Sequence, residues 1–422
     1  MPTEKELRDL AYLVKECEDQ NATIDIFPHK WGYTIQMNKT TVDILDFCFE
    51  FLKDRLGKFF KGEFAELISL CLQFKKRRIV EASGRSTDGY VRMVSPWVIP
   101  FALVVVRGSS GNDENLWFTV WDEKEKAWGQ DAEYHECKTR NGPALAQHGD
   151  FLYCVHRGSG SDDSLWWTKY STNDGWSDDK VFPSHFTESN ISLVEFQNTL
   201  YCFHRGNNSN EELWYCTFDS ERNTWNADMK IEVGDKKNIM YCYTGCAVAV
   251  FNENLHLVYQ NRDNNQFDHL IFDGKAWLNN TKKPLGYTSD TPALVAYQNK
   301  LLLVHRGNEK YHGDDKMYYD TYDGTKWSGD SLIPDTYSKY GPGLAVFNDK
   351  VFMVHRGSGN EHHLYYSTYE DSTWSKNTKC PNVYTGAPPA ISCYTDPQCN
   401  TDNYLDTTTA EPRLICVHRG YG

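Results

Sequence analysis

The chain has 422 residues, 58 acidic and 44 basic, which gives a formal net charge of −14. This acidity argues against nucleic acid as a partner, because phosphate binding needs clustered Lys and Arg. No apolar run approaches the roughly 20 residues of a membrane-spanning helix. The charged N-terminus is unlike a secretory signal, so we expect a soluble protein that is cytoplasmic or non-classically secreted.

The first part of the chain, residues 1–92, contains no repeat. Its periodicity predicts a small helical or α+β domain, with helices over 4–19, 42–56 and 63–79 and short strands over 23–27 and 32–37. We interpret it as a packed accessory or oligomerisation domain. The alternative is a membrane-active or toxin-like segment, since its helices are amphipathic and a basic cluster follows at Lys75–Arg78. Membrane contact and homo-oligomer formation therefore stay open.

The remainder, residues 93–422, repeats itself. Related segments are PALAQHGDFLYCVHRG at 143–158, PALVAYQNKLLLVHRG at 292–307 and PGLAVFNDKVFMVHRG at 342–357. A Trp closes successive units at 128, 176, 225, 277, 327 and 374, in steps of 48, 49, 52, 50 and 47 residues. A sustained period near 50 residues predicts β-propeller blades.

Each unit is predicted to be a four-stranded antiparallel blade. Each unit begins with a strand of small apolar residues, a polar turn and a second apolar strand. A Gly/Asn/Asp loop, an aromatic third strand and a short fourth strand at the closing Trp complete it. Seven blades are favoured if 93–108 is a degenerate first copy. The last unit stops after its second strand, so it is either a two-stranded seventh blade or a blade that N-terminal strands complete. A six-bladed ring with extra terminal strands is the alternative.

The 13 Cys residues are predicted to be reduced thiols, because an odd number excludes a complete set of disulfides within one chain. Cys154, Cys202 and Cys416 occupy a repeat position that elsewhere holds Val, Leu or Met, which indicates a core position. No CxxC and no zinc-type Cys/His spacing occurs, so we expect no metal and no cofactor.

The repeat unit, with its Arg-Gly, its Asp/Asn loop, its Leu-Trp/Tyr-Tyr strand and its Asp-Gly-x-x-Trp turn, resembles the repeats of sugar-binding β-propellers. These include the fucose-specific fungal lectins and related bacterial propeller lectins. Phe272–Trp277 is most similar to the fucose-lectin pattern, and the PALAV…LYCVHRG wording is similar to other microbial repeat proteins. The resemblance covers about three quarters of the chain. It implies a propeller that binds glycans or glycoproteins, although the Glu of the fucose-lectin pocket has no counterpart in register.

Four sets of repeated residues are the candidate ligand contacts. The basic set is Arg107, Arg157, Arg205, Arg306, Arg356 and Arg419, and the histidines that precede five of them are His156, His204, His305, His355 and His418. The strand aromatics are Trp166, Trp214, Tyr318 and Tyr365, and the closing rings are Trp176, Trp225, Trp277, Trp327 and Trp374. Guanidinium groups give paired hydrogen bonds and rings stack on sugars. In the structural alternative the arginines pair with nearby acids and the rings pack between blades.

Near-equal units favour repeated weak binding sites over one catalytic centre, because avidity adds over several sites. We therefore predict a multivalent, lectin-like protein without catalysis. The alternatives are a sialidase-like or other glycoside hydrolase propeller and a protein-interaction propeller. No GxSxG, HExxH or P-loop motif occurs.

Overall fold

A computed structural model of the chain describes four N-terminal strands and residues 113–421 except 130, 172–173, 309–314 and 396–411. The chain divides into two compact units, residues 1–112 with Gly422 and residues 113–421. No helix among the described residues is long and apolar enough to cross a membrane.

The N-terminal unit contains an antiparallel sheet of four strands in the order β1-β2-β3-β4. Their bounds are β1 Ile24–Pro28, β2 Gly32–Asn38, β3 Tyr90–Pro96 and β4 Val104–Val106. The two strands predicted around Pro28 are confirmed. The three predicted helices lie outside the described residues.

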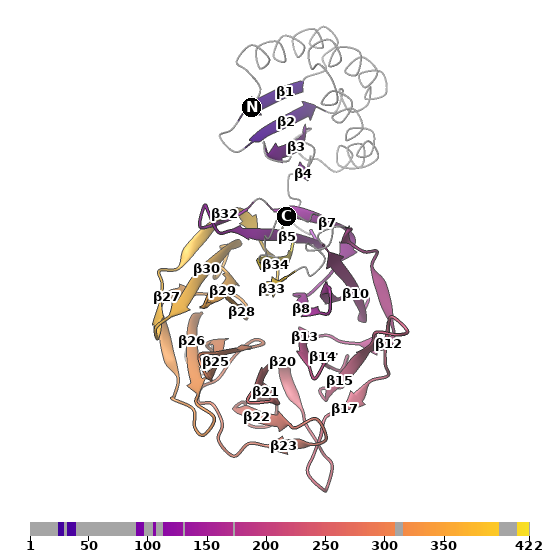
Figure 1. Cartoon of the computed structure of the whole chain (residues 1–422), viewed down its shortest axis with the longest axis vertical. Coiled ribbons are helices and arrows are strands. Elements are labelled where there is room, and N and C mark those ends of the chain that lie inside the picture. The colour runs from indigo at the N-terminus through magenta and orange to yellow at the C-terminus, as the bar shows by residue number, and fades with distance from the viewer. Residues whose placement is uncertain are drawn as a thin grey trace, which may run out of the picture. The chain divides into compact units, whose positions relative to one another are not determined.

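The second unit is a β-propeller, and its six sheets surround a central opening (Figure 1). Blades 1 and 2 consist of β8 Ala144–His148, β9 Phe151–Arg157, β10 Ser164–Ser171, β11 Gly175–Trp176 and β12 Lys180–Phe186, then β13 Ser192–Phe196, β14 Thr199–Arg205, β15 Leu213–Asp219, β16 Thr224–Trp225 and β17 Met229–Lys230. Blade 3 consists of β18 Glu232–Val233, β19 Asn238–Ile239, β20 Cys242–Phe251, β21 Asn254–Asn261, β22 Phe267–Phe272 and β23 Trp277–Asn279.

Blades 4 and 5 consist of β24 Ala293–Tyr297, β25 Lys300–Arg306, β26 Lys316–Tyr322 and β27 Ser331–Tyr337, then β28 Gly343–Phe347, β29 Lys350–Arg356, β30 His363–Glu370, β31 Thr373–Trp374 and β32 Thr378–Tyr384. Blade 6 joins the two ends of the propeller: β33 Ala390–Tyr394 and β34 Arg413–Arg419 pair with β5 Asn115–Asp122, β6 Ala127–Trp128 and β7 Ala132–Lys138.

This closure corrects the favoured count of seven blades to six. The segment 93–108 is not a first repeat, because β3 pairs with β2 over seven residues, from Gly32↔Pro96 to Asn38↔Tyr90, and β4 pairs with β3. The terminal half-unit is not a separate two-stranded blade either, because β34 pairs with β5 from Arg419↔Leu116 to Ile415↔Val120. The six-bladed alternative is therefore confirmed, and the propeller is closed by hydrogen bonds between its first and last strands.

The polar turn between the first two strands of a blade has a defined backbone geometry. In Asn252–Glu253 and Asn348–Asp349 both residues have positive φ, between 48° and 62°. This is the type I′ turn whose twist matches an antiparallel hairpin, and short polar residues tolerate it best.

The Gly after the repeated Arg is required by a close approach. A Cβ on Gly158 would lie 2.3 Å from Asp162 Oδ2. Asp162 turns back here because its carboxylate accepts hydrogen bonds from the Ser164 N–H and the Trp166 Nε1–H, at 2.9 Å each. The tight loop therefore explains why Gly follows the repeated Arg.

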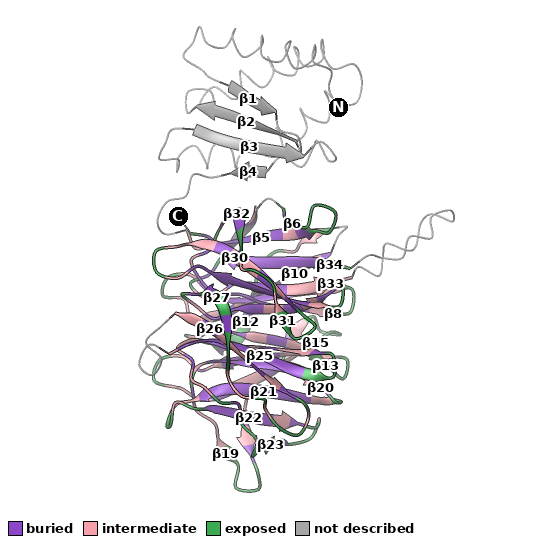
Figure 2. Cartoon of the chain, turned by 90° about the vertical axis from the view of Figure 1, so that its left-hand side faces the viewer, coloured by how far each residue is buried: buried purple, intermediate pink, exposed green. Residues whose placement is uncertain are grey.

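The core lies in the seams between neighbouring blades, and Figure 2 shows buried strands running through the propeller with exposed residues mainly in its loops. In the seam between blades 1 and 2, for example, Trp225 is 2% exposed and stacks on Phe182 at 4.7 Å between ring centroids. Cys154, Cys202 and Cys416 are fully buried, which confirms the predicted core position, and the nine described cysteines are free thiols.

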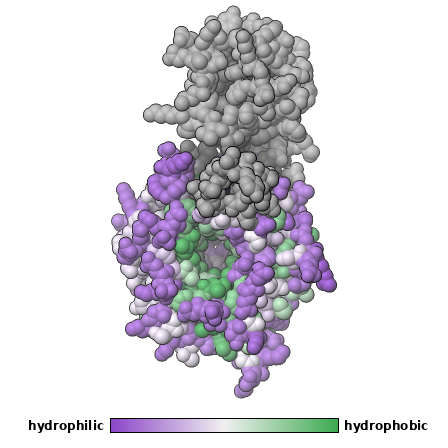
Figure 3. Space-filling view, viewed as in Figure 1, coloured by the Kyte–Doolittle hydropathy of each residue, from purple (hydrophilic) through white to green (hydrophobic). Residues whose placement is uncertain are grey.

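An apolar channel of about 630 Å³ follows the axis between the first strands. Small residues such as Pro143, Ala144, Pro292 and Ala293 line it, as expected where six strands converge. Figure 3 shows apolar side chains around the central opening and hydrophilic ones toward the rim.

Candidate functional site

The repeated arginines lie at the end of the second strand of their blades, where blade 3 has Gln260, and three of them bind the loop that leads to the next blade. Their Nε–H groups donate to the carbonyl oxygens of Thr187, Ser338 and Thr385, at 2.9, 2.8 and 3.1 Å, from Arg157, Arg306 and Arg356 respectively. Each acceptor lies in the loop that leads from the outer strand into the following blade. These guanidinium groups therefore fix the loops that lead from one blade to the next.

Carboxylates occupy much of the remaining donor capacity. Arg157 pairs with Asp163 and Arg306 pairs with Asp315, and both arginine side chains are about 95% buried. Arg205 Nη2 lies 3.3 Å from Glu211 Oε1. Arg157, Arg205 and Arg306 thus pair with acids, as the structural alternative expects, and ligand contact by them stays a prediction. Arg107 lies outside the described residues.

Arg205 and Arg419 differ from the other described arginines of the repeat. The Nε–H of each is buried and has no hydrogen-bond partner among the described residues. Both side chains line an opening at the axis, which is considered below. An unpaired buried donor carries a free-energy cost of about 1–3 kcal/mol, which a ligand acceptor would remove.

The five histidines are clamped inside the blades at 0–1% exposure. In each, Nδ1 donates to the carbonyl of the following Arg at 3.0–3.3 Å. Nε2 faces a side chain near the outer strand of the same blade, and the pairs are His156–Asp179, His204–Asp228, His305–Asp330, His355–Asn377 and His418–Asp131. This burial gives each imidazole a structural role, and ligand contact by them stays a prediction.

The pKa values of two clamped histidines differ with their partners. Burial alone would lower the pKa of His418, but the Asp131 carboxylate raises it above the ordinary value. Burial lowers the pKa of His355, whose partner is the neutral Asn377. The charge of the partner therefore accounts for the opposite directions of these two pKa shifts.

The first ring of each aromatic doublet lies beside the clamp. Tyr318 stacks on His305 and Tyr365 on His355, at 5.8 and 5.7 Å between centroids. Trp166 and Trp214 are half-buried in the equivalent positions. The second ring packs within the blade stack, as Trp167 does at 3% exposure.

The closing Trp residues lie in the seams. Trp225 and Trp277 are buried, and Trp176, Trp327 and Trp374 are half-buried. Trp327 Nε1 donates to His269 Nδ1 at 3.3 Å, whereas the other four indole N–H groups have no partner in the described part of the chain. Core packing accounts for these rings, and pocket contact by them stays a prediction.

Two adjoining openings lie where the arginine-bearing strands end. The axial mouth, about 630 Å³, is lined by one segment from each blade, including Asn141, Asn190, Tyr243, Asp290, Tyr340 and Pro388. The interblade hollow, about 1410 Å³, lies between blades 3 and 4 and is lined by Tyr243, Gln260, Arg262, Asp290, Arg306 and Tyr340 among others. The two openings share Tyr243, Asp290 and Tyr340.

The interblade hollow combines an open ring with polar groups. Tyr243 is 58% exposed. Gln260 stands where other blades have Arg, and its buried Oε1 has no hydrogen-bond partner among the residues described. The Arg262 guanidinium lies over the Tyr241 ring at 4.3 Å and 3.2 Å from Glu211 Oε2.

Asp290 is the acidic side chain among the described residues lining the interblade hollow. Its carboxylate accepts hydrogen bonds from Asn190 Nδ2 and from the N–H groups of Thr291 and Gly341, at 2.7–3.1 Å. Burial raises its pKa, although these hydrogen bonds oppose the shift. Asp290 thus joins the loops of blades 2, 4 and 5 at the mouth.

Sequence reasoning missed Tyr243, Tyr340 and Asp290. A Thr or Ser recurs in the loop before most blades, as at Thr288 and Ser338. Asp290 and Tyr340 lie two residues after it, at a position that in other blades holds Asn141, Ser189 and Ala387. The sequence signal that could have identified these residues is their variation between otherwise similar blades. Most of the regular Arg, His and Trp positions have structural contacts within or between the blades, and ligand contact by them stays a prediction.

No protein-family model and no curated protein matches the chain. Among solved structures, it is similar to AofleA from Arthrobotrys oligospora at 14% identity, over 66% of this chain and 79% of that one, with a TM-score of 0.47. It is also similar to the Aleuria aurantia lectin, described as a six-bladed β-propeller that recognises fucose, at 12% identity over 71% and 94% with a TM-score of 0.46.

An exo-β-1,3-galactanase variant from Phanerochaete chrysosporium is similar at 9% identity over 57% and 60% of the two chains, with a TM-score of 0.40. At these identities and scores the function has to be argued from the residues of this chain.

Proposed function

We propose that this chain is a carbohydrate-binding, lectin-like protein that takes its ligand in the axial mouth and the interblade hollow. The observation that carries the proposal is the exposed ring of Tyr243 beside unpaired buried polar atoms. These are the Nε–H groups of Arg205 and Arg419 and the Oε1 of Gln260, with no partners among the described residues.

A polyhydroxylated ligand suits this combination, because a hydroxyl group both donates and accepts hydrogen bonds. If the side chains shift so that a hydroxyl reaches these buried atoms, it can accept from a guanidinium N–H and donate to an amide oxygen, which removes the cost of leaving them unpaired. The C–H face of a sugar ring packs against Tyr243. A nucleic acid is disfavoured by the net charge of −14.

Binding without turnover is the form of the proposal. Glycoside hydrolysis needs two carboxyl groups facing the scissile bond. Among the described residues, Asp290 and Glu188 are the acids that line the two openings. Three N–H donors engage the Asp290 oxygens, and Glu188 Oε2 lies 3.9 Å from Arg205 Nη1. Turnover of a fluorogenic glycoside panel by the wild-type chain, abolished in Asp290→Asn, would favour the hydrolase alternative instead.

A glycan array at high protein density tests the proposal. We expect binding by the wild type and by Tyr384→Ala, and loss of binding by Tyr243→Ala. Tyr384 is a matched control because it is a 41% exposed tyrosine on the outer strand β32. No glycan bound by the wild type, with a protein partner co-purifying, would replace the proposal by the protein-interaction alternative.

The number of binding sites on the propeller is part of the proposal, because the sequence predicts a multivalent protein. Equal pockets at several blade boundaries would give avidity through effective concentration. The interblade hollow instead forms where the repeat is irregular, because Gln260 replaces Arg and Tyr259 replaces His in blade 3. The stoichiometry with a monovalent sugar distinguishes several equal sites from one principal site.

A further inference from the structure

One repeat position lies against the histidine clamp of the following blade. It is two residues before the Thr or Ser that precedes a blade (Cys242 in the case of blade 3), and it is occupied by Cys137, His185, Met240, Gly286, Thr336 and Val383 in turn. Its proximity to the clamp is shown at Gly286, where a Cβ would lie 2.5 Å from Asp330 Oδ2 and 3.3 Å from His305 Cε1. A longer side chain here therefore reaches the His–Asp pair.

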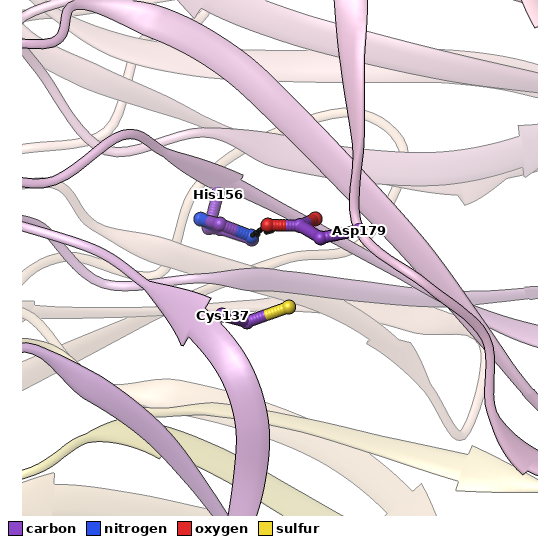
Figure 4. A group of neighbouring side chains, drawn as sticks. All are labelled: Cys137, His156 and Asp179. Carbon is purple, nitrogen blue, oxygen red and sulfur yellow. Dashed lines mark hydrogen bonds and ion pairs between the residues drawn. The ribbon is translucent and has the colours of Figure 1, made fainter.

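At the boundary between blades 6 and 1 this position carries a thiol. Cys137 Sγ, a ring nitrogen of His156 and a carboxylate oxygen of Asp179 all lie within 4.8 Å of one another (Figure 4). His156 Nε2 is 3.1 and 3.2 Å from the two Asp179 oxygens. Cys137 and His156 are fully buried, whereas the Asp179 side chain is 15% exposed and leaves a path to solvent.

We propose that Cys137, His156 and Asp179 bind a divalent cation of the zinc class. Thiolate, imidazole and carboxylate are the three ligand types that Zn²⁺ takes in proteins, and three such side chains leave one position of a tetrahedral ion for water. With metal–ligand bonds of about 2.0–2.1 Å, the nitrogen and oxygen ligands of a tetrahedron lie about 3.3 Å apart. The observed 3.1–3.2 Å between His156 Nε2 and Asp179 is close to that edge.

The second ring nitrogen of His156 is already fixed. Nδ1–H donates to the Arg157 carbonyl at 3.0 Å, which is the outer hydrogen bond that orients a histidine for metal ligation through Nε2. On binding, the Cys137 thiol releases its proton to solvent and the cation takes the place of that proton.

A second cluster of the same three ligand types lies at the next boundary, between blades 1 and 2, with its thiol on β15. His185 takes the position of Cys137, and its ring nitrogen, Cys216 Sγ and an Asp228 oxygen also lie within 4.8 Å of one another. His185 Nε2 is 3.3 Å from Asp228 Oδ1, and His204 Nε2 approaches the same oxygen at 3.0 Å. His185 Nε2 also lies 2.8 Å from the Asn226 carbonyl, a contact that metal binding would replace.

The other blades supply matched substitutions. Val383 and Thr336 occupy the Cys137 position, and Asn377 occupies the Asp179 position, in blades that fold alike. Cys137→Val, His185→Thr and Asp179→Asn therefore each introduce a side chain that this fold already accepts. Cys393→Ser is the control, because Cys393 is half-buried and belongs to neither cluster.

The test is the metal content of the full chain after chelator treatment, loading with Zn²⁺ and dialysis, measured by elemental mass spectrometry. We expect two equivalents in the wild type and in Cys393→Ser, one in Cys137→Val or His185→Thr, and none in the double variant. Co²⁺ loading should give a thiolate-to-metal charge-transfer absorption that is reduced in Cys137→Val. If Cys137→Val does not fold, Asp179→Asn makes the same measurement.

Several results decide between outcomes. No bound metal in the wild type, or full uptake in the double variant, overturns the proposal. One equivalent that is lost in Cys137→Val upholds the first site and refutes the second. Because the readout is metal content, it is independent of whether the chain binds sugar.

Discussion

A buried pair of histidines in the seam between blades 3 and 4 should make the propeller sensitive to acid. His256 on β21 and His269 on β22 are 3% and 0% exposed, and His256 Nδ1 is 2.9 Å from His269 Nε2. His269 Nδ1 accepts from Asn280 Nδ2 at 2.9 Å and from Trp327 Nε1 of blade 4. The pair thus links the two blades between which the interblade hollow opens.

Burial lowers the pKa of His256 to about 4, and burial together with the neighbouring His256 lowers the pKa of His269 to about 3. Both rings therefore stay neutral in the folded protein at pH 5. The unfolded chain binds a proton at each histidine below its ordinary value of 6.5. Since the unfolded state then binds more protons than the folded state, the free energy of unfolding falls as the pH falls.

The size of the effect follows from the pKa difference. Each pH unit below 6.5 costs about 1.4 kcal/mol per histidine until the folded pKa is reached. At pH 5 the loss is about 2 kcal/mol per histidine, or about 4 kcal/mol for the pair, as an order of magnitude. The stability is fully present above pH 6.5 and is lost as the pH falls from there to about 4 for His256 and about 3 for His269.

The measurement is urea unfolding of the full chain at pH 8 and pH 5, with the double variant His256→Phe, His269→Tyr as the reference. Blade 5 holds Phe352 and Tyr366 at these two positions, so the replacements suit the fold. Contributions of all other groups cancel in the difference between the two proteins. An equal loss of stability in both proteins between pH 8 and pH 5 would refute the reasoning.

Three further predictions concern the seams and loops that hold the site. Trp225→Ala should lower the free energy of unfolding by about 3–5 kcal/mol, because a buried ring stacked on Phe182 is removed; a loss below 1 kcal/mol would contradict the seam packing. Arg157→Ala should lower the free energy of unfolding by about 3 kcal/mol, because Asp163 loses its partner. The control Arg222→Ala should change it by less than about 0.5 kcal/mol, because the Arg222 side chain is 79% exposed. Equal effects of the two substitutions in urea titrations would argue against a structural role for Arg157. Gly158→Ala should lower the free energy of unfolding by about 2 kcal/mol, because its Cβ displaces Asp162 from two hydrogen bonds. Gly160→Ala should lower it by about 1 kcal/mol, because Gly160 has a φ of +57° and no atom lies within 4 Å of the added Cβ. Thermal unfolding that ranks the two variants in the opposite order would contradict this account of the loop.

The propeller could be predicted from the sequence because a 50-residue period repeats the same strand and turn signals in each blade. The number of blades could not, because the apolar segment 93–108 reads like a first strand pair. Only the pairing of β3 with β2, and of β34 with β5, separates it from the ring. Strand pairing over hundreds of residues leaves no local signal.

The candidate site was less predictable than the fold for a related reason. Repeated residues such as His305 and Arg306 are shared between blades because each blade needs them for its own clamp and loop. The openings are instead lined by residues that differ from blade to blade, such as Tyr243 and Asp290. The proposed metal ligands were equally hidden, because Cys137 and His156 come from neighbouring blades and no short spacing marks them.

The measurement that most directly tests the central claim is calorimetric titration of the chain with the monovalent sugar that the array identifies. We predict binding at the Tyr243 ring, with the affinity of Tyr243→Ala at least 10-fold weaker and that of Tyr384→Ala unchanged, since 10-fold corresponds to about 1.4 kcal/mol, within the range that buried aromatic contacts supply. Equal affinities of the wild type and Tyr243→Ala, with both proteins folded, would contradict a sugar site in the axial mouth and the interblade hollow.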